Sequence, residues 1–223
     1  MFPDIYQRRE YYLQSYIHGS TKPWLVAVLA AGQGSRFGGG KQLALLGGRP
    51  LVRWPVDAAL ASGLHGVLVV VGYHASQVRQ ALPRDSRVEI IENPEPAEGM
   101  GSSLALAASR ARELEAAGLV MLLGDMPFVT PQTIAKVAKA AETAPAGAAA
   151  GSVDGKRSHP VAFSSRHFSE LCGLGGDKGA RDVLASLANG LALVEVAPET
   201  RIDVDNPEDL AGASNIWKRL GRT

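Results

Sequence analysis

Three apolar runs of strand length do most to limit the folds open to this chain. The runs are WLVAVL at Trp24–Leu29, GVLVVVG at Gly66–Gly72 and LVMLLGD at Leu119–Asp125, and polar residues do not alternate with apolar ones in any of them. Strands that are apolar on both faces are typical of a parallel sheet that helices cover on both sides. Because helical patterns separate the runs, the sequence predicts a Rossmann-like three-layer α/β/α fold with a mostly parallel central sheet.

The segments between and after these runs carry helix and strand signals of their own. Thr130 followed by Pro131 is typical of a helix N-cap and first turn. Pro50 and Gly63 would bracket an earlier helix over residues 50–62. The remaining expected elements are helices at 75–82, 102–117, 166–171, 180–188 and 206–220, strands at 87–91, 159–163 and 191–196, and a linker at 144–151.

Length and composition exclude several classes of protein. The 223 residues suit one domain, which we place at residues 23–220, with residues 1–22 as an N-terminal extension. A net charge of +1 offers no polyanion-binding surface, so no nucleic-acid partner is expected. The longest apolar run has eight residues, far below the ~20 of a membrane span, and the single cysteine, Cys172, permits no disulfide framework. We therefore expect a cytoplasmic protein without a membrane partner.

Three polar or glycine-rich segments follow predicted strands. They are the loop after the first strand, Asp125 after the fourth, and the loop 93–103 after the third. In an open α/β sheet, ligands bind at the carboxyl ends of the strands. These segments should therefore lie together at one ligand-binding edge.

The loop LAAGQGSRFGGGKQ at Leu29–Gln42 fits neither of two familiar phosphate-binding templates. In the dinucleotide fingerprint the third glycine would be Phe37, and no acidic residue ends the second strand. In the P-loop the first glycine would be Ser35 and the magnesium-binding hydroxyl would be Gln42. Arg36 and the nearby lysine still favour anion binding by backbone amides and cations, and the alternative is a turn that needs glycine only for its shape.

This loop also carries a family resemblance. LAAGQGSRFG at Leu29–Gly38, followed by Lys41, resembles the signature of nucleotidyltransferases that act on sugars and on the molybdenum cofactor. Five further segments, in the same order, resemble the branch that includes molybdenum cofactor cytidylyltransferase. They are EGMGSSL (Glu98–Leu104), GDMPFVT (Gly124–Thr130), RSHPVAF (Arg157–Phe163), GGDKGAR (Gly175–Arg181) and DVDNPEDL (Asp203–Leu210).

The resemblance implies a reaction and its participants. The enzyme would transfer CMP from CTP to the terminal phosphate of molybdopterin and release pyrophosphate, with Mg²⁺ or Mn²⁺ as cofactor. Residues of about 23–130 would bind the nucleotide, and those of about 131–220 the acceptor. A molybdenum hydroxylase or its maturation chaperone is a further implied partner.

The resemblance also implies site residues. Lys41, Arg36 and Asp125 would be catalytic, and Asp125 and Asp205 would bind the metal, since carboxylates suit a hard cation. The implied acceptor-binding residues are His159, Lys178 and Arg181. The implied nucleotide-binding residues are Leu29, Ala30, Ala31, Gly32, Gly34, Lys41, Gly99, Gly101, Ser102 and Ser103.

Plainer interpretations stay open beside these roles. Asp205 could simply stabilise the start of the last helix, Ser102 could be an ordinary cap, and His159 could be a satisfied strand histidine. The run Ala30-Ala31-Gly32 favours CTP over GTP within the resemblance. A guanylyl-, sugar- or polyol-phosphate nucleotidyltransferase is the alternative enzyme, and a nucleotide-binding accessory factor for hydroxylase maturation is the alternative of another class.

Overall fold

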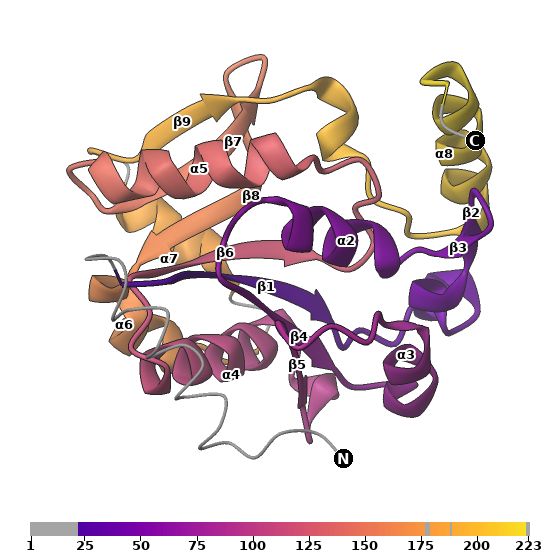
Figure 1. Ribbon diagram of the computed structural model, residues 1–223, viewed down its shortest axis with the longest axis horizontal. Coiled ribbons are helices and arrows are strands. Elements are labelled where there is room, and N and C mark those ends of the chain that lie inside the picture. Colours follow the sequence, from indigo (N-terminus) through magenta and orange to yellow (C-terminus); the bar gives the residue numbers. More distant parts are fainter. Residues whose placement is uncertain (1–21, 177–178, 188, 222–223) are drawn as a thin grey trace.

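The computed structural model describes residues 22–176, 179–187 and 189–221 and is built on a seven-stranded sheet (Figure 1). The strand order is β5-β4-β1-β6-β8-β7-β9, and every neighbouring pair is parallel except the two that involve β8. The predicted fold class is confirmed. The strands are β1 (Trp24–Ala30), β4 (Gly66–Val71), β5 (Val88–Glu92), β6 (Gly118–Leu123), β7 (Ala148–Val153), β8 (Lys156–Ser164) and β9 (Ala192–Glu195).

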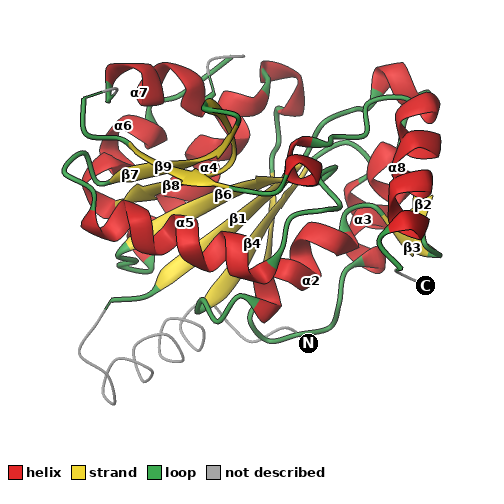
Figure 2. Cartoon of the chain, turned by 90° about the horizontal axis from the view of Figure 1, so that it is seen from above, coloured by secondary structure: helices red, strands yellow, loops and turns green. Residues whose placement is uncertain are grey.

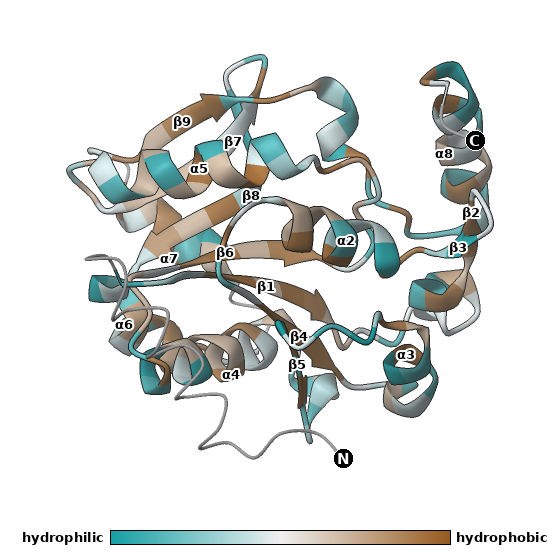
Figure 3. Ribbon diagram, viewed as in Figure 1, coloured by the Kyte–Doolittle hydropathy of each residue, from teal (hydrophilic) through white to brown (hydrophobic). Residues whose placement is uncertain are grey.

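Helices cover both faces of this sheet, and Figure 2 shows the resulting layers. Alternate residues of β1 enter different cores: Leu25 packs with α4, α6 and α7 on one face, and Val26 with α2, α3 and α5 on the other. Figure 3 shows the apolar residues concentrated on the central strands. The helices are α2 (Arg53–Ala61), α3 (Ala75–Ala81), α4 (Met100–Glu113), α5 (Pro131–Thr143), α6 (Phe168–Cys172), α7 (Ala180–Ser186) and α8 (Pro207–Arg219).

Several predicted boundaries are wrong for identifiable reasons. Pro50 does not open a helix, because Arg49–Pro50 (β3) pairs with Leu45–Leu46 (β2) in a small hairpin and α2 begins only at Arg53. Gly118 is not a helix stop, since α4 ends at Glu113 and Gly118 begins β6. The linker expected at 144–151 is shorter, because Ala148 already belongs to β7. The Thr130 cap is confirmed, as its hydroxyl accepts the Thr133 N–H at 3.2 Å.

A third, smaller core joins the hairpin to the C-terminal helix. Trp217 of α8 packs against Trp54 with ring centroids 4.2 Å apart, and Leu46, Phe128 and Val204 complete the contact. This core seats α8 on the hairpin that directly follows the glycine-rich loop. The predicted extension at 1–22 lies outside the described residues except for Lys22, and no helix of the described chain is long and apolar enough for a membrane span.

The contact between α8 and the hairpin predicts that alanine destabilises the protein much more at Gly47 than at the neighbouring Gly48. Gly47 (φ +54°) and Gly48 (φ +74°) both have left-handed backbones, so alanine strains either position. A Cβ on Gly47 would also lie 2.8 Å from the Trp217 ring, whereas a Cβ on Gly48 would meet no atom within 4 Å. We expect Gly47→Ala to lower the free energy of unfolding by about 1–3 kcal/mol more than Gly48→Ala, because overpacking adds to the backbone strain. Urea denaturation of both variants measures this difference, and equal losses would contradict it.

Candidate active site

The loop after β1 owes its shape to glycine. Gly34, Gly38, Gly39 and Gly40 have φ values of +68°, +86°, +100° and +63°, a region that residues with a Cβ rarely adopt. Short 3-10 turns at Ser35–Phe37 and Lys41–Leu43 alternate with these glycines. Shape therefore explains four of the five glycines, and it also places Lys41 directly after a left-handed residue, at the end of the loop.

Gln42 is a residue of this loop that sequence reasoning passed over. Its side chain is 3% exposed, and Nε2 donates a hydrogen bond of 2.9 Å to the Gly32 carbonyl. The amide thus ties the end of the loop back to its beginning and fixes the path between Gly32 and Lys41. In the sequence Gln42 is only a mismatch to the P-loop, and its bond to Gly32 becomes evident only in the folded loop.

Lys41 lies between two carboxylates that are distant in the sequence. Its Nζ is 2.6 Å from Asp125 Oδ2 and 2.6 Å from Asp205 Oδ1, and Arg36 is 3.7 Å from the other Asp205 oxygen. Asp125 follows β6, and the Val204 N–H donates to the Asp125 carbonyl at 3.2 Å, which brings the two acidic segments together. The loop, the end of β6 and the approach to α8 therefore converge on one point.

The charges of this cluster are mutually dependent. Burial opposes the charge on Lys41, but Asp125 and Asp205 outweigh it and raise the pKa of the ammonium. The hydrogen bond from Lys41 in turn lowers the pKa of Asp205. Partial burial raises the pKa of Asp203, and the carboxylates of Asp125 and Asp205 raise it further. Asp203, for which the sequence predicted no role, adds a third carboxyl group near the pair.

The carboxylate pair has the chemistry of a magnesium or manganese site. Asp125 Oδ1 is buried and has no hydrogen-bond partner among the described residues, so one lone-pair site is left for a cation. No group of three or more His, Cys, Asp or Glu residues within the described ranges could hold a metal by itself. Mg²⁺ is usually bound by one or two carboxylates together with substrate phosphates and water. Asp125 and Asp205 fit that donor set.

The loop before α4 is organised by a buried asparagine. Asn93, 4% exposed, donates from Nδ2 to the hydroxyls of Ser102 at 2.9 Å and Ser103 at 3.0 Å. Its Oδ1 accepts the Glu95 N–H at 3.0 Å, and Ser102 donates to the Gly99 carbonyl at 2.9 Å. Both serine hydroxyls are therefore engaged in shaping the loop. Asn93 lies in the loop that follows β5, and the sequence predicted no role for this residue.

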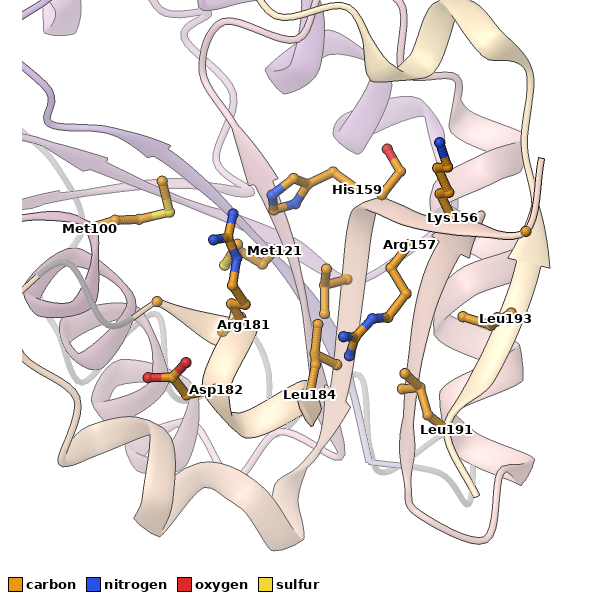
Figure 4. Close-up of a pocket in the computed structure, with 15 residues that line it drawn as sticks. Met100, Met121, Lys156, Arg157, His159, Arg181, Asp182, Leu184, Leu191 and Leu193 are labelled. Carbon is orange, nitrogen blue, oxygen red and sulfur yellow. The ribbon is translucent and has the colours of Figure 1, made fainter. Parts of the chain in front are cut away.

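Beside this loop lies a cavity of about 1140 Å³ between α7 and the β7–β8–β9 part of the sheet. His159 and Arg181 both line it, and Figure 4 shows Arg181 extending toward the imidazole. Arg157 and Lys156 line it as well and were not among the predicted residues. Lys178 lies outside the described residues. Among the described residues, the wall therefore carries the cations Lys156, Arg157 and Arg181 and one carboxylate, Asp182. Its apolar part consists of Met100, Met121, Val161, Leu184, Leu191 and Leu193.

His159 is neither a satisfied strand histidine nor an open surface group. Its Nδ1 is buried and has no hydrogen-bond partner in the part of the chain that the structure describes. Burial lowers the pKa of His159, against the opposite effects of the Met121 main chain and the Asp203 carboxylate. A neutral imidazole with a spare ring nitrogen can donate or accept a hydrogen bond from a molecule in the cavity.

Comparison with known protein families shows which family this chain belongs to. The family model for the MobA-like NTP transferase domain matches residues 26–191. The chain belongs to this family. The matched span contains Lys41 and Asp125 but stops before Asp205, so the place of Asp205 beside Lys41 comes from the structure.

Two curated relatives match most of this MobA-like protein. The purine catabolism protein PucB of Bacillus subtilis is 31% identical over 196 residues, which cover 84% of this chain and 94% of PucB. The bifunctional protein GlmU of Trichlorobacter lovleyi is 33% identical over 138 residues, and the match spans 61% of this chain but only 29% of GlmU.

A solved structure resembles the whole fold. Rv0371c from Mycobacterium tuberculosis H37Rv superposes with a TM-score of 0.76 at 28% identity, covering 88% of this chain and 99% of that one. Rv0371c has also been crystallised in complex with manganese, and that structure superposes with a TM-score of 0.73 at 26% identity, covering 88% of this chain and 100% of that one. These structures agree with the fold of this MobA-like chain, and the family model identifies it as an NTP transferase.

Proposed function

We propose that the protein transfers CMP from CTP to the terminal phosphate of molybdopterin and releases pyrophosphate. The observation that carries this proposal is the meeting of Lys41, Asp125 and Asp205 at the carboxyl edge of the sheet. A large cation-lined cavity opens beside the same edge, as an enzyme with two anionic substrates requires.

The nucleotide is held by the loop after β1 and by the carboxylate pair. Lys41 and Arg36 bind the triphosphate, while the main chain of residues 29–34 and the loop of Gly99, Gly101, Ser102 and Ser103 surround the nucleoside. Asp125 and Asp205 hold Mg²⁺ or Mn²⁺, which, when bound, would offset negative charge on the phosphates. The manganese complex of Rv0371c supports this choice of metal.

The transfer needs no strong base on the protein. A phosphate oxygen of the acceptor is already an anion, and it attacks the α-phosphorus of CTP as the bond to the bridging oxygen of the β-phosphate breaks. The electron pair of that bond leaves with pyrophosphate. Lys41 and Arg36 stabilise the charge that accumulates on the leaving group, in a site preorganised for it. Lys41 is well placed for this task because its carboxylate partners keep it charged.

The acceptor occupies the cavity between α7 and the sheet. His159, Arg181 and Lys178 bind its polar groups, and the imidazole supplies one ring nitrogen that has no partner in the described protein. Met100, the first residue of α4, lies between the nucleotide-binding residues Gly99 and Gly101 and also lines the cavity, so the two substrates share a wall. This shared wall supports direct transfer between substrates bound side by side.

The packing around Ala31 supports a pyrimidine nucleotide. Ala31 is 5% exposed, and a Cβ built on Gly72 would lie 2.9 Å from the Ala31 methyl and 2.7 Å from Pro96. The ends of β1 and β4 and the loop after β5 are therefore closely packed at this point. The Ala31 methyl is therefore fixed in place, and within the family resemblance an alanine at this position favours the smaller base over a purine.

Calorimetric titration with CTP, GTP and ATP in the presence of Mg²⁺ tests the choice of base. We expect binding of CTP and little of the purine nucleotides, and tight GTP binding with none of CTP would overturn the proposal. Labelled CTP with molybdopterin or with sugar and polyol phosphates then tests the acceptor. A sugar- or polyol-phosphate acceptor is the second candidate, because the loop after β1 also resembles the signature of sugar nucleotidyltransferases. Binding of CTP without pyrophosphate release for any acceptor would indicate the accessory role.

A further inference from the structure

The start of α8 is stabilised without any help from the Asp205 side chain. Asn206 is the N-cap, and its Oδ1 accepts the Asp209 N–H at 2.8 Å. Asp209 completes a capping box, because its Oδ2 accepts the Asn206 N–H at 3.1 Å. The same Asp209 oxygen also accepts the Asp205 N–H at 2.9 Å. The side chain of Asp205 is therefore free to face Lys41, and helix capping does not explain it.

The main chain around Asp205 is held from two sides. On one side the Val204 N–H donates to the Asp125 carbonyl, and on the other the Asp205 N–H donates to Asp209. A carboxylate 2.6 Å from Lys41 can keep that place only if its own backbone does not move. On the α8 side, the Asp209 carboxylate fixes this backbone by its hydrogen bond to the Asp205 amide.

We propose that Asp209 is a positioning residue of the active site, which fixes the turn that presents the Asp205 carboxylate to Lys41 and to the metal. This inference rests on the proposed role of Asp205 as a metal ligand. Groups that orient a metal ligand from behind usually contribute about 10–100-fold to metal affinity or activity. The Asp209 carboxylate acts on Asp205 by accepting a hydrogen bond from the Asp205 backbone amide, and it contacts no substrate itself.

The far end of α8 makes the effect of Asp209 local. Trp217 and Ala213 are buried in the small core with Leu46, Leu51 and Phe128, so the helix stays docked on the hairpin when its first turn loosens. Loss of the Asp209 carboxylate should therefore free the Asp205 turn without detaching the helix.

Two variants of the same capping box separate positioning from stability. Asp209→Ala removes the acceptor for the amides of Asp205 and Asn206, whereas Asn206→Ala removes only the acceptor for the Asp209 amide. Both remove one arm of the same capping box, so both should lower the Tm. Only Asp209→Ala should weaken Mn²⁺ binding, by about 10–100-fold.

The full nucleotide-free chain is titrated with Mn²⁺, and the electron paramagnetic resonance signal of free Mn²⁺ measures how much of the ion remains unbound. Asp209→Asn, which keeps one acceptor oxygen, should give an intermediate loss and serves if the alanine variant does not fold. Equal Mn²⁺ affinity for Asp209→Ala, Asp209→Asn and the unmodified chain would overturn the positioning role, as would an equal loss in Asn206→Ala. Asp205→Asn, measured in parallel, distinguishes the two failures. If it too leaves Mn²⁺ binding unchanged, the proposed metal role of Asp205 fails, and the inference fails with it.

Discussion

Pyrophosphate release is expected to fall about 1000-fold when Asp125 is replaced by asparagine, since metal ions contribute several kcal/mol to the transition state and each 1.4 kcal/mol is tenfold in rate. Asparagine keeps the size of the side chain and leaves Lys41 its second partner, Asp205. The fold should therefore survive, and the loss should appear in kcat rather than in the Tm. A coupled pyrophosphate assay with CTP and acceptor measures it.

Glu142 provides a matched control for this change. It is an exposed carboxylate of α5 that pairs with Lys139 at 2.7 Å, so Glu142→Gln removes the same charge from a surface ion pair. Such pairs contribute about 0–1 kcal/mol to stability, and activity should stay at the level of the unmodified protein. If Asp125→Asn retains pyrophosphate release within a few-fold of that control, Asp125 is not a metal ligand of the reaction.

Replacement of Lys41 by methionine is expected to have two opposite effects. The rate with CTP should fall about 100–1000-fold, because the leaving pyrophosphate loses a preorganised cation. Mn²⁺ binding to the nucleotide-free protein should become tighter, because the Lys41 ammonium lies 2.6 Å from both carboxylates, in the place that the metal would take. In the absence of substrate the lysine acts as the counter-ion of the pair, and a triphosphate that attracts it would release the carboxylates for the metal.

Lys139→Met removes a lysine from an ion pair of the same kind on the surface and is the control for both effects. It should change neither the rate with CTP nor Mn²⁺ affinity. Weaker Mn²⁺ binding in Lys41→Met than in the control would contradict competition between the lysine and the metal. An unchanged rate would contradict its role in binding the triphosphate.

The centre of the fold could be predicted because its signals are local. Apolar runs such as Leu119–Leu123 can be satisfied only in a sheet that is covered on both faces, and a carboxylate at the end of such a run must lie at the ligand edge. The Thr130 cap is equally local, since its hydroxyl serves an amide three residues away. Pro50 was misjudged because pairing with Leu45 in a short hairpin, which packs against Trp217 of α8, prevailed over the helix signal.

The site residues that the sequence did not reveal were missed for one common reason. Asn93 and Gln42 act through hydrogen bonds to segments nine or ten residues away, so their importance depends on how a loop folds back. The ion pair of Lys41 with Asp205 spans 164 positions, and family resemblance alone suggested that these residues belong together. That Asp209, and not Asp205, serves the helix end could be read only from the hydrogen bonds of the capping box.

The reversed direction of β8 has a consequence for how such enzymes can diversify. β8 runs antiparallel to both β6 and β7, so its first residues, Lys156 to His159, reach the ligand edge that the other central strands reach with their last. Two cations of the cavity, Lys156 and Arg157, are therefore carried by the β7–β8 hairpin, whose tip at Asp154–Gly155 is exposed and open around Gly155. Insertions or exchanges in that hairpin would reshape the acceptor cavity and leave the loop after β1 untouched. Under the proposed function, such changes would alter the choice of acceptor and leave the nucleotide donor the same.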